Sequence, residues 1–115
     1  MTDAATTAAT YFEAWGDRNF GRLRSVLADE VDFAGPLASV QGADDCLRGL
    51  QGMAKMMTGL DVRKVFCDGA DVLTWFDLST KEAGTVPVAN WMQVQDGKIT
   101  RIRVAFDARG IAGGS

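Results

Sequence analysis

Histidine is absent from this sequence of 115 residues. Its absence excludes Ser-His-Asp and Cys-His catalytic groups, and it removes the commonest ligand of transition metals in proteins. The two cysteines, Cys46 and Cys67, do not form a paired motif, and with scattered carboxylates they do not make a convincing zinc site. We therefore expect no metal site and no cofactor, so that any chemistry would depend on Asp, Glu, Tyr, Lys, Arg or Cys side chains.

The sequence also lacks long apolar runs, a basic surplus and the features of a secretion signal. No apolar segment approaches the roughly 18 residues of a membrane span, so we expect no membrane partner. The net charge is −3 with acidic and basic residues interspersed, which argues against nucleic-acid binding. Residues 1–5 carry neither the positive charge nor the apolar segment of a signal peptide, and we expect a cytoplasmic protein with reduced cysteines.

The composition is typical of one globular domain. Apolar residues make up 47% and charged residues 23%, which argues against disorder. A chain of this length can bury a single hydrophobic core. We expect one domain over residues 1–115, with residues 1–3 and 110–115 frayed.

The first half of the sequence has apolar residues at helical spacing. This pattern predicts a helix over residues 3–16 and a shorter second helix capped by Asp17. A third helix is predicted to begin at residues 42–45, after a short extended piece at Val31–Phe33. The inward face of the third helix is expected to carry Leu47, Leu50, Met53, Met56 and Met57.

From Leu60 onward the apolar residues alternate, which is the pattern of half-buried strands. Strands are predicted at residues 61–68, 71–79, 85–95 and 98–107. Their joins include Asp68-Gly69 and Asp96-Gly97, dipeptides that favour hairpins. Three helices followed by an antiparallel meander predict an α+β fold with the helices packed on one face of the sheet.

Several short motifs, taken in order and spacing, resemble a known fold family. They are Tyr11–Trp15, Leu27–Val31, Gly35-Pro36, Gln41-Gly42, Asp96–Ile99 and Phe106-Asp107. Over about residues 8–109 the sequence is similar to the nuclear-transport-factor-2-like fold, within its SnoaL-like and ketosteroid-isomerase-like group. The resemblance implies a cone-shaped α+β barrel with a curved, mainly antiparallel sheet, an apolar cavity between sheet and helices, and a homodimer formed through the sheet. This fold hosts many activities, so the resemblance says less about function.

Two polar residues are candidates for this cavity. Tyr11, the only tyrosine, falls where ketosteroid isomerases place the tyrosine that donates a hydrogen bond to the developing oxyanion. Asn90 lies on an otherwise apolar strand face, where an amide must find partners or cost stability. The resemblance puts Asn90 at the position of the second acid of the oxyanion site, as a weaker donor. Each residue also has a purely structural interpretation, as a core tyrosine or as an amide bonded to backbone.

Other positions depart from the enzymes of this group. The isomerase base should come directly before Pro36, and Gly35, which cannot transfer a proton, stands there. Limonene-epoxide-hydrolase-like proteins carry an arginine–aspartate pair on an earlier strand. Only Asp77 comes near that position here, and it is shifted by one residue, which puts its side chain on the other face of the strand. Their water-holding tyrosine and asparagine correspond to Phe33 and Gly35. Both activities are therefore disfavoured.

Asp107 is the remaining acidic residue that could act as a catalytic base. The segment Phe106–Arg109 is similar to the ending of the last strand in SnoaL-like and limonene-epoxide-hydrolase-like proteins, where an aspartate serves as general base. Burial beside aromatic residues would raise the pKa of such a carboxyl group, as a base requires. Strand alternation also puts Arg103 on the same face, so an ion pair or a solvated strand end are competing interpretations.

The leading hypothesis is a cofactor-free isomerase, cyclase or hydratase that acts on a small hydrophobic molecule, polycyclic or terpenoid in size. Asp107 would be its general base, and Tyr11 and Asn90 would polarise the substrate. The residues expected to line the cavity are Trp15, Phe33, Met53, Met57, Phe76, Met92 and Phe106. The alternatives are a ligand-binding module without catalysis and a dimeric interaction protein that uses outward residues such as Trp91 or Arg101.

Overall fold

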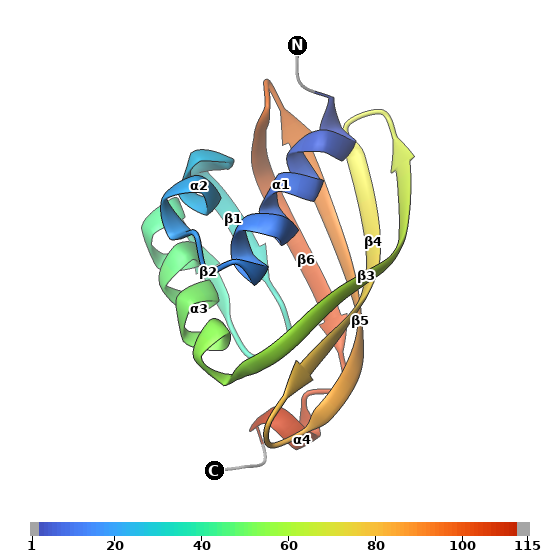
Figure 1. Ribbon diagram of the computed structural model, residues 1–115. Helices are drawn as coiled ribbons and strands as arrows, with labels where there is room; N and C mark the ends of the chain where they lie inside the picture. The colour runs from blue at the N-terminus through green and yellow to red at the C-terminus, as the bar shows by residue number, and fades with distance from the viewer. Residues whose placement is uncertain (1–2, 113–115) are drawn as a thin grey trace.

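The computed structural model of the protein describes residues 3–112, which contain four helices and six strands (Figure 1). The helices are α1 (Ala4–Gly16), α2 (Phe20–Ser25), α3 (Ala43–Met56) and α4 (Arg109–Ala112). The strands are β1 (Leu27–Ala34), β2 (Ser39–Gln41), β3 (Met57–Asp68), β4 (Asp71–Thr80), β5 (Gly84–Gln95) and β6 (Lys98–Phe106). The predicted α+β fold is confirmed, with α1, α2 and α3 packed on one curved sheet.

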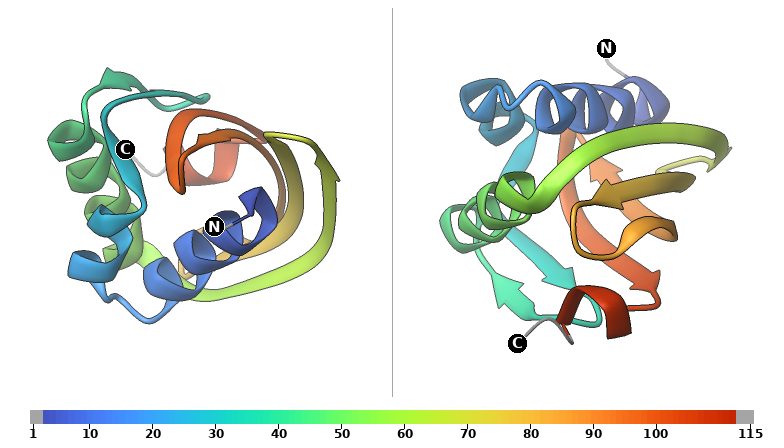
Figure 2. Two further views of the ribbon diagram at one scale, coloured as in Figure 1. Left: turned by 90° about the horizontal axis from the view of Figure 1, so that it is seen from above. Right: turned by 60° about the horizontal axis from the view of Figure 1, so that its bottom comes forward.

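The six strands form a single sheet in the order β2-β1-β6-β5-β4-β3. Neighbouring strands are antiparallel except β1 and β6, which run parallel. Figure 2 shows the sheet curling around α1 without closing, so that α1 occupies its concave side. Along β4 the side chains alternate between buried and exposed, as expected for a strand with one covered face.

Helix α1 packs against the concave side of the sheet. Its first turn is capped by Asp3, whose Oδ1 accepts a hydrogen bond from the backbone N–H of Thr6 at 2.8 Å. Tyr11 and Trp15 are one turn apart on its buried face. The indole Nε1 of Trp15 donates to the backbone oxygen of Leu50 at 3.0 Å and so ties α1 to α3.

Three local predictions were wrong. Asp17 ends α1 instead of capping α2, whose cap is the side chain of Asn19. Met57 is the first residue of β3, which begins four residues before the predicted strand. Met56, predicted to face inward, is 37% exposed at the end of α3. Each error lies at an element boundary, Asp17 between two helices and Met56 and Met57 between a helix and a strand.

Part of each segment expected to fray belongs to a described helix or its cap. Asp3, expected to fray, caps α1, and residues 110–112 belong to α4. The remaining residues of the two segments expected to fray, 1–2 and 113–115, lie outside the described part of the chain. None of the helices described here is long and apolar enough to cross a membrane.

Arg18 joins the end of α1 to the junction of α3 and β3. Its backbone has a left-handed conformation, with φ of 57°, between α1 and α2. Its Nη2 donates to the backbone oxygen of Met57 at 2.7 Å and to that of Ala54 at 2.9 Å. Because carbonyl groups at a helix end have no partner within the helix, this guanidinium stabilises the end of α3.

We expect Arg18→Met to lower the free energy of unfolding by about 2 kcal/mol, because it removes two charge-assisted hydrogen bonds to carbonyls. Urea denaturation at pH 7 measures the loss. The matched control is Arg22→Met, since Arg22 pairs with Glu13 at 3.2 Å on the exposed surface, where an ion pair contributes about 0–1 kcal/mol. Equal losses in the two variants would contradict the role given to Arg18.

Candidate functional site

An apolar cavity of about 140 Å³ lies between the sheet and the helices α1 and α3. Its lining from the helices is Tyr11, Trp15, Cys46, Gly49, Leu50 and Met53. Its lining from the sheet is Phe33, Val40, Phe76, Leu78, Val88, Asn90, Val104 and Phe106. The irregular segment from Gly35 to Ala38 completes it. The cavity is therefore lined by side chains from both halves of the chain.

Most of the predicted site residues meet in this cavity. Tyr11 and Asn90 both line it, as do five of the seven residues expected around a ligand, namely Trp15, Phe33, Met53, Phe76 and Phe106. Met92 does not, because its side chain is fully buried in the core. Met57 is also absent from the lining and contacts a different hollow, on the other side of α1.

Asn90 is the polar group of the sheet face of this cavity. It lies in the middle of β5, opposite Thr74 on β4 and Val104 on β6. Asn90 is 2% exposed, and its Oδ1 has no hydrogen-bond partner among the described residues. Buried polar atoms in proteins nearly always have partners, so this unpaired amide oxygen is an exception in a residue of the cavity wall.

Tyr11 and Cys46 are the titratable groups of the helical wall. Burial raises the pKa of the Tyr11 hydroxyl well above its ordinary value, and the nearby Cys46 raises it further. Burial also raises the pKa of the Cys46 thiol to about 11. Both groups therefore keep their protons at neutral pH, and both are neutral hydrogen-bond donors there.

The raised pKa of Cys46 predicts a loss of stability in alkali. The folded state holds the thiol proton up to pH 11, whereas the unfolded state releases it near the ordinary value of 9.0. The stabilisation is complete below pH 9 and is lost as pH rises toward 11, by about 3 kcal/mol at 1.36 kcal/mol per pKa unit.

Urea denaturation from pH 8 to pH 11 under reducing conditions measures this slope. Cys46→Ala should flatten it between pH 8 and pH 10. Above pH 10 the slope of Tyr11 remains, because the unfolded state releases the tyrosine proton near its ordinary value of 10.0 and the folded state holds it. Cys67→Ala, at an exposed cysteine, should leave the slope unchanged. The same slope in both variants would show that the buried thiol is not its cause.

The segment that follows β1 was missed by the sequence analysis. Gly35, Pro36, Leu37 and Ala38 contribute to the cavity lining. The backbone N–H of Gly35 donates to the oxygen of Ala38 at 2.9 Å, which closes a turn. A Cβ at Gly35 would lie 3.4 Å from the Cβ of Val104. The turn therefore lies directly against β6, and the Gly-Pro pair was the only signal of this wall.

Asp107 is not where a general base for this cavity would lie. It follows the end of β6 on the surface and is absent from the cavity lining. Its Oδ1 accepts from Nε of Arg109 at 2.9 Å and its Oδ2 from Nη2 at 2.6 Å. These contacts lower the pKa of Asp107 to about 2. Of the interpretations left open by the sequence, the ion-paired, solvated strand end is the one found, with Arg109 as the partner instead of Arg103.

The other carboxylates considered from the sequence are also paired outside the cavity. Asp32 binds Nη2 of Arg103 at 2.9 Å, and Asp77 binds Nε of Arg63 at 2.9 Å. No Asp or Glu of the described residues lines the cavity. Nor do the described residues contain a cluster of three or more His, Cys, Asp or Glu side chains that could hold a metal ion.

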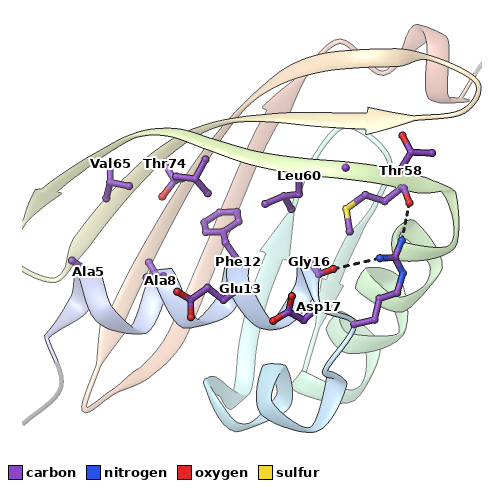
Figure 3. A pocket seen from close by; sticks show the side chains of 15 residues that line it. Ala5, Ala8, Phe12, Glu13, Gly16, Asp17, Thr58, Leu60, Val65 and Thr74 are labelled. Carbon is purple, nitrogen blue, oxygen red and sulfur yellow. Dashed lines mark hydrogen bonds between the residues drawn. The ribbon is translucent and has the colours of Figure 1, made fainter.

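A second hollow, a groove of about 490 Å³, lies between α1 and β3. Figure 3 shows Ala5, Ala8 and Phe12 on α1 facing Leu60, Val65 and Thr74 across it. Phe12 lines the groove and Phe76 lines the cavity, with ring centroids 4.9 Å apart, so this aromatic pair separates the two hollows. Arg18 is among the charged groups at one end of the groove. Its guanidinium already donates hydrogen bonds to backbone carbonyl oxygens.

Comparison with solved structures places the fold among known ones. A protein from Kribbella flavida DSM 17836 is 27% identical over 98% of this chain and 93% of that chain, with a TM-score of 0.92. A nuclear-transport-factor-2-like protein of unknown function from Cytophaga hutchinsonii is 22% identical over 95% and 94% of the two chains, with a TM-score of 0.85. An epoxide hydrolase of the limonene-epoxide-hydrolase-like type from M. tuberculosis is 22% identical over 96% and 87%, with a TM-score of 0.79.

No curated protein is similar enough in sequence to count as a relative. The sequence model of the SnoaL-like domain, however, matches residues 8–102, which is most of the chain. This match covers most of α1, most of the cavity lining and nearly all of the sheet, and it confirms the resemblance seen in the motifs. The protein therefore belongs to the SnoaL-like domain family, with the nuclear-transport-factor-2-like fold.

Proposed function

We propose that the protein binds a small, mainly apolar molecule in the cavity between its sheet and helices. The observation that carries this proposal is the meeting of Tyr11 and Asn90 in an otherwise apolar lining, with one polar atom left unpaired. A few polar groups on an apolar wall are the usual composition of a small-molecule site. Binding is favoured over acid–base catalysis because Asp107 is surface-exposed and ion-paired, and the titratable groups of the cavity keep their protons at neutral pH.

The volume of the cavity limits what it can hold. At about 140 Å³ it is smaller than most drug-binding pockets, which span roughly 300–1,000 Å³. It is close to an engineered apolar cavity of about 150 Å³ that binds benzene. The ligand that fits without rearrangement is therefore about the size of one aromatic ring, smaller than the polycyclic molecule expected from the sequence.

Binding of toluene, measured by the shifts of backbone amides in an NMR titration, tests the proposal. We expect saturable shifts confined to residues that line the cavity. Val88→Phe, which puts a ring into the cavity from β5, should abolish them while keeping the fold. Asp107→Asn should bind toluene as the wild type does. Absence of saturable shifts in the wild type would refute the proposal.

A second proposal concerns the outer face of the sheet. Phe66 on β3 and Leu73 and Trp75 on β4 are exposed by 59%, 44% and 44%. Phe66 and Leu73 are direct cross-strand partners, so they form one patch. Exposed apolar patches mark interaction surfaces, and we propose that this one supports a homodimer. Sedimentation should show a dimer that Trp75→Lys converts to monomer, whereas a monomeric wild type would exclude it.

A further inference from the structure

The inner part of the cavity is buried and apolar. Its lining residues are exposed by 2% or less, and they are Tyr11 and Cys46 from the helices and Phe76, Val88 and Asn90 from the sheet. The surface that faces the cavity is almost entirely apolar, and the unpaired oxygen of Asn90 is itself buried and closed to a molecule in the cavity. A polar group placed here would lose its hydrogen bonds to water, so the part of a ligand that is held here is apolar.

The outer part of the lining is in contact with solvent. The N–H of Gly35 donates to the oxygen of Ala38 at 2.9 Å, so Pro36 and Leu37 form the tip of the hairpin between β1 and β2. Both residues line the cavity and both are exposed, Leu37 by 42%. Gly49 on α3 is also exposed and also lines the cavity. Because Pro36, Leu37 and Gly49 contact both the cavity and solvent, the cavity opens between them, and we call this opening the mouth.

We infer that the cavity takes amphipathic molecules in one orientation: an apolar ring fills the buried part, and a polar or charged group of the same molecule projects through the mouth beside Leu37 into solvent. This inference rests on the proposed binding function and adds the chemical class of the ligand. It also changes how the volume limits that ligand. Only the ring has to fit within about 140 Å³, because the chain that carries the polar group lies outside.

Toluene, 3-phenylpropan-1-ol and 3-phenylpropylamine form a matched set of probes, because all three carry the same phenyl ring. Toluene has no polar group, the alcohol ends in a neutral hydroxyl, and the amine ends in an ammonium at neutral pH. Dissociation constants are measured by NMR titration at low ionic strength. We expect all three to bind the wild type and to shift the amides of the same buried lining residues. A cavity of this volume without a mouth would hold toluene alone.

A charge placed at residue 37 tests where the polar group lies. An ammonium that projects past this residue is attracted by a carboxylate there, whereas a hydroxyl is nearly unaffected. In Leu37→Asp we expect the affinity of the amine relative to the alcohol to rise about threefold, the effect of one charge pair about 6 Å apart in water at low salt. Leu37→Lys should lower the same ratio by a similar factor.

Leu73→Asp is the matched control for Leu37→Asp. Leu73 is exposed by 44% on the outer face of β4, nearly as much as Leu37, and it does not line the cavity. The same added charge should therefore leave the ratio of amine to alcohol affinity as it is in the wild type. An equal rise in both aspartate variants would reflect the net charge of the protein and would overturn the orientation inferred for the ligand.

The outcomes separate this inference from the proposed function. If toluene binds but the alcohol and the amine do not, the cavity has no usable mouth, and the inference is overturned while apolar binding stands. If the ratio of amine to alcohol affinity is the same in Leu37→Asp as in the wild type, the polar group lies elsewhere and the inference is again overturned. If no probe binds, the proposed function fails, and the inference fails with it.

A second measurement needs no variant. In the wild type saturated with 3-phenylpropan-1-ol, we expect intermolecular nuclear Overhauser effects from the ring protons to the methyl groups of Val88 in the buried part of the cavity. The methylene protons next to the hydroxyl should give such effects to the methyl groups of Leu37. The opposite pattern would place the hydroxyl in the buried part and overturn the inference.

Discussion

Phe76→Ala is expected to lower the free energy of unfolding by about 3–5 kcal/mol, the usual cost of truncating a buried phenylalanine. Phe76 is 2% exposed on β4 and lies between the two helical aromatics that meet the sheet. Its ring centroid is 4.9 Å from that of Phe12 and 6.3 Å from that of Trp15. Because Phe76 already borders a cavity, the space it vacates joins existing empty volume and cannot be filled by a small shift of neighbours.

Urea denaturation at neutral pH measures this loss, and Phe66→Ala is the matched control. Phe66 is 59% exposed on β3, so the same substitution should change the stability by about 0.5 kcal/mol or less. Because Phe66 lies in the patch proposed to form the dimer, all three proteins are compared at a concentration at which sedimentation shows monomers. A loss in Phe76→Ala no greater than in Phe66→Ala would mean that the aromatic contact between α1 and β4 does not hold the sheet to the helices.

The fold could be predicted from the sequence because its signals are local. The change from helical to alternating spacing near residue 60 located the helices and the four long strands, and Asp96-Gly97 marked the turn between β5 and β6. The parallel pairing of β1 with β6 could not be predicted in this way. It joins Phe33 to Ile102 across most of the chain, and periodicity reports only which face of a strand is buried, never its partner.

The residues of the candidate site that could be predicted are polar side chains on otherwise apolar faces. Asn90 stood out as a polar residue on an apolar strand face, and Tyr11 as the one phenol on an apolar helix face, and both line the cavity. The interpretation of Asp107 as a general base of the cavity found no support, because β6 ends at Phe106. One residue beyond the strand, alternation no longer predicts which way a side chain points. The carboxylate of Asp107 instead forms an ion pair with Arg109, two positions later.

The composition of the cavity wall supports the proposal that this protein binds a molecule without acid–base catalysis. The wall keeps the apolar residues and two polar groups, while the position before Pro36 is Gly35 and the acids Asp32 and Asp77 are engaged by Arg103 and Arg63. A site of this kind can hold and orient a molecule. Proton transfer would require a group that changes its protonation state near neutral pH, and Tyr11 and Cys46 have pKa values shifted away from that range.

Asn90→Leu is expected to raise the free energy of unfolding by about 1–3 kcal/mol, which is the usual penalty of a buried polar group without a partner. Leucine removes the unpaired oxygen and places methyl groups against an apolar wall. The measurement is urea denaturation of the protein without ligand. An increase in stability would identify Asn90 as a residue that costs the empty protein stability, as residues kept for function often do.

Thr7→Val is the matched comparison for the stability change of Asn90→Leu. Thr7 is 1% exposed, and its Oγ1 donates to the backbone oxygen of Asp3 at 3.3 Å, so it is a buried polar residue whose partner is present. Losing that bond should lower the stability by about 1 kcal/mol, the opposite sign to Asn90→Leu. If both variants lose stability, the Asn90 amide is satisfied in the free protein. Opposite signs would show that the fold carries an unpaired buried acceptor at Asn90.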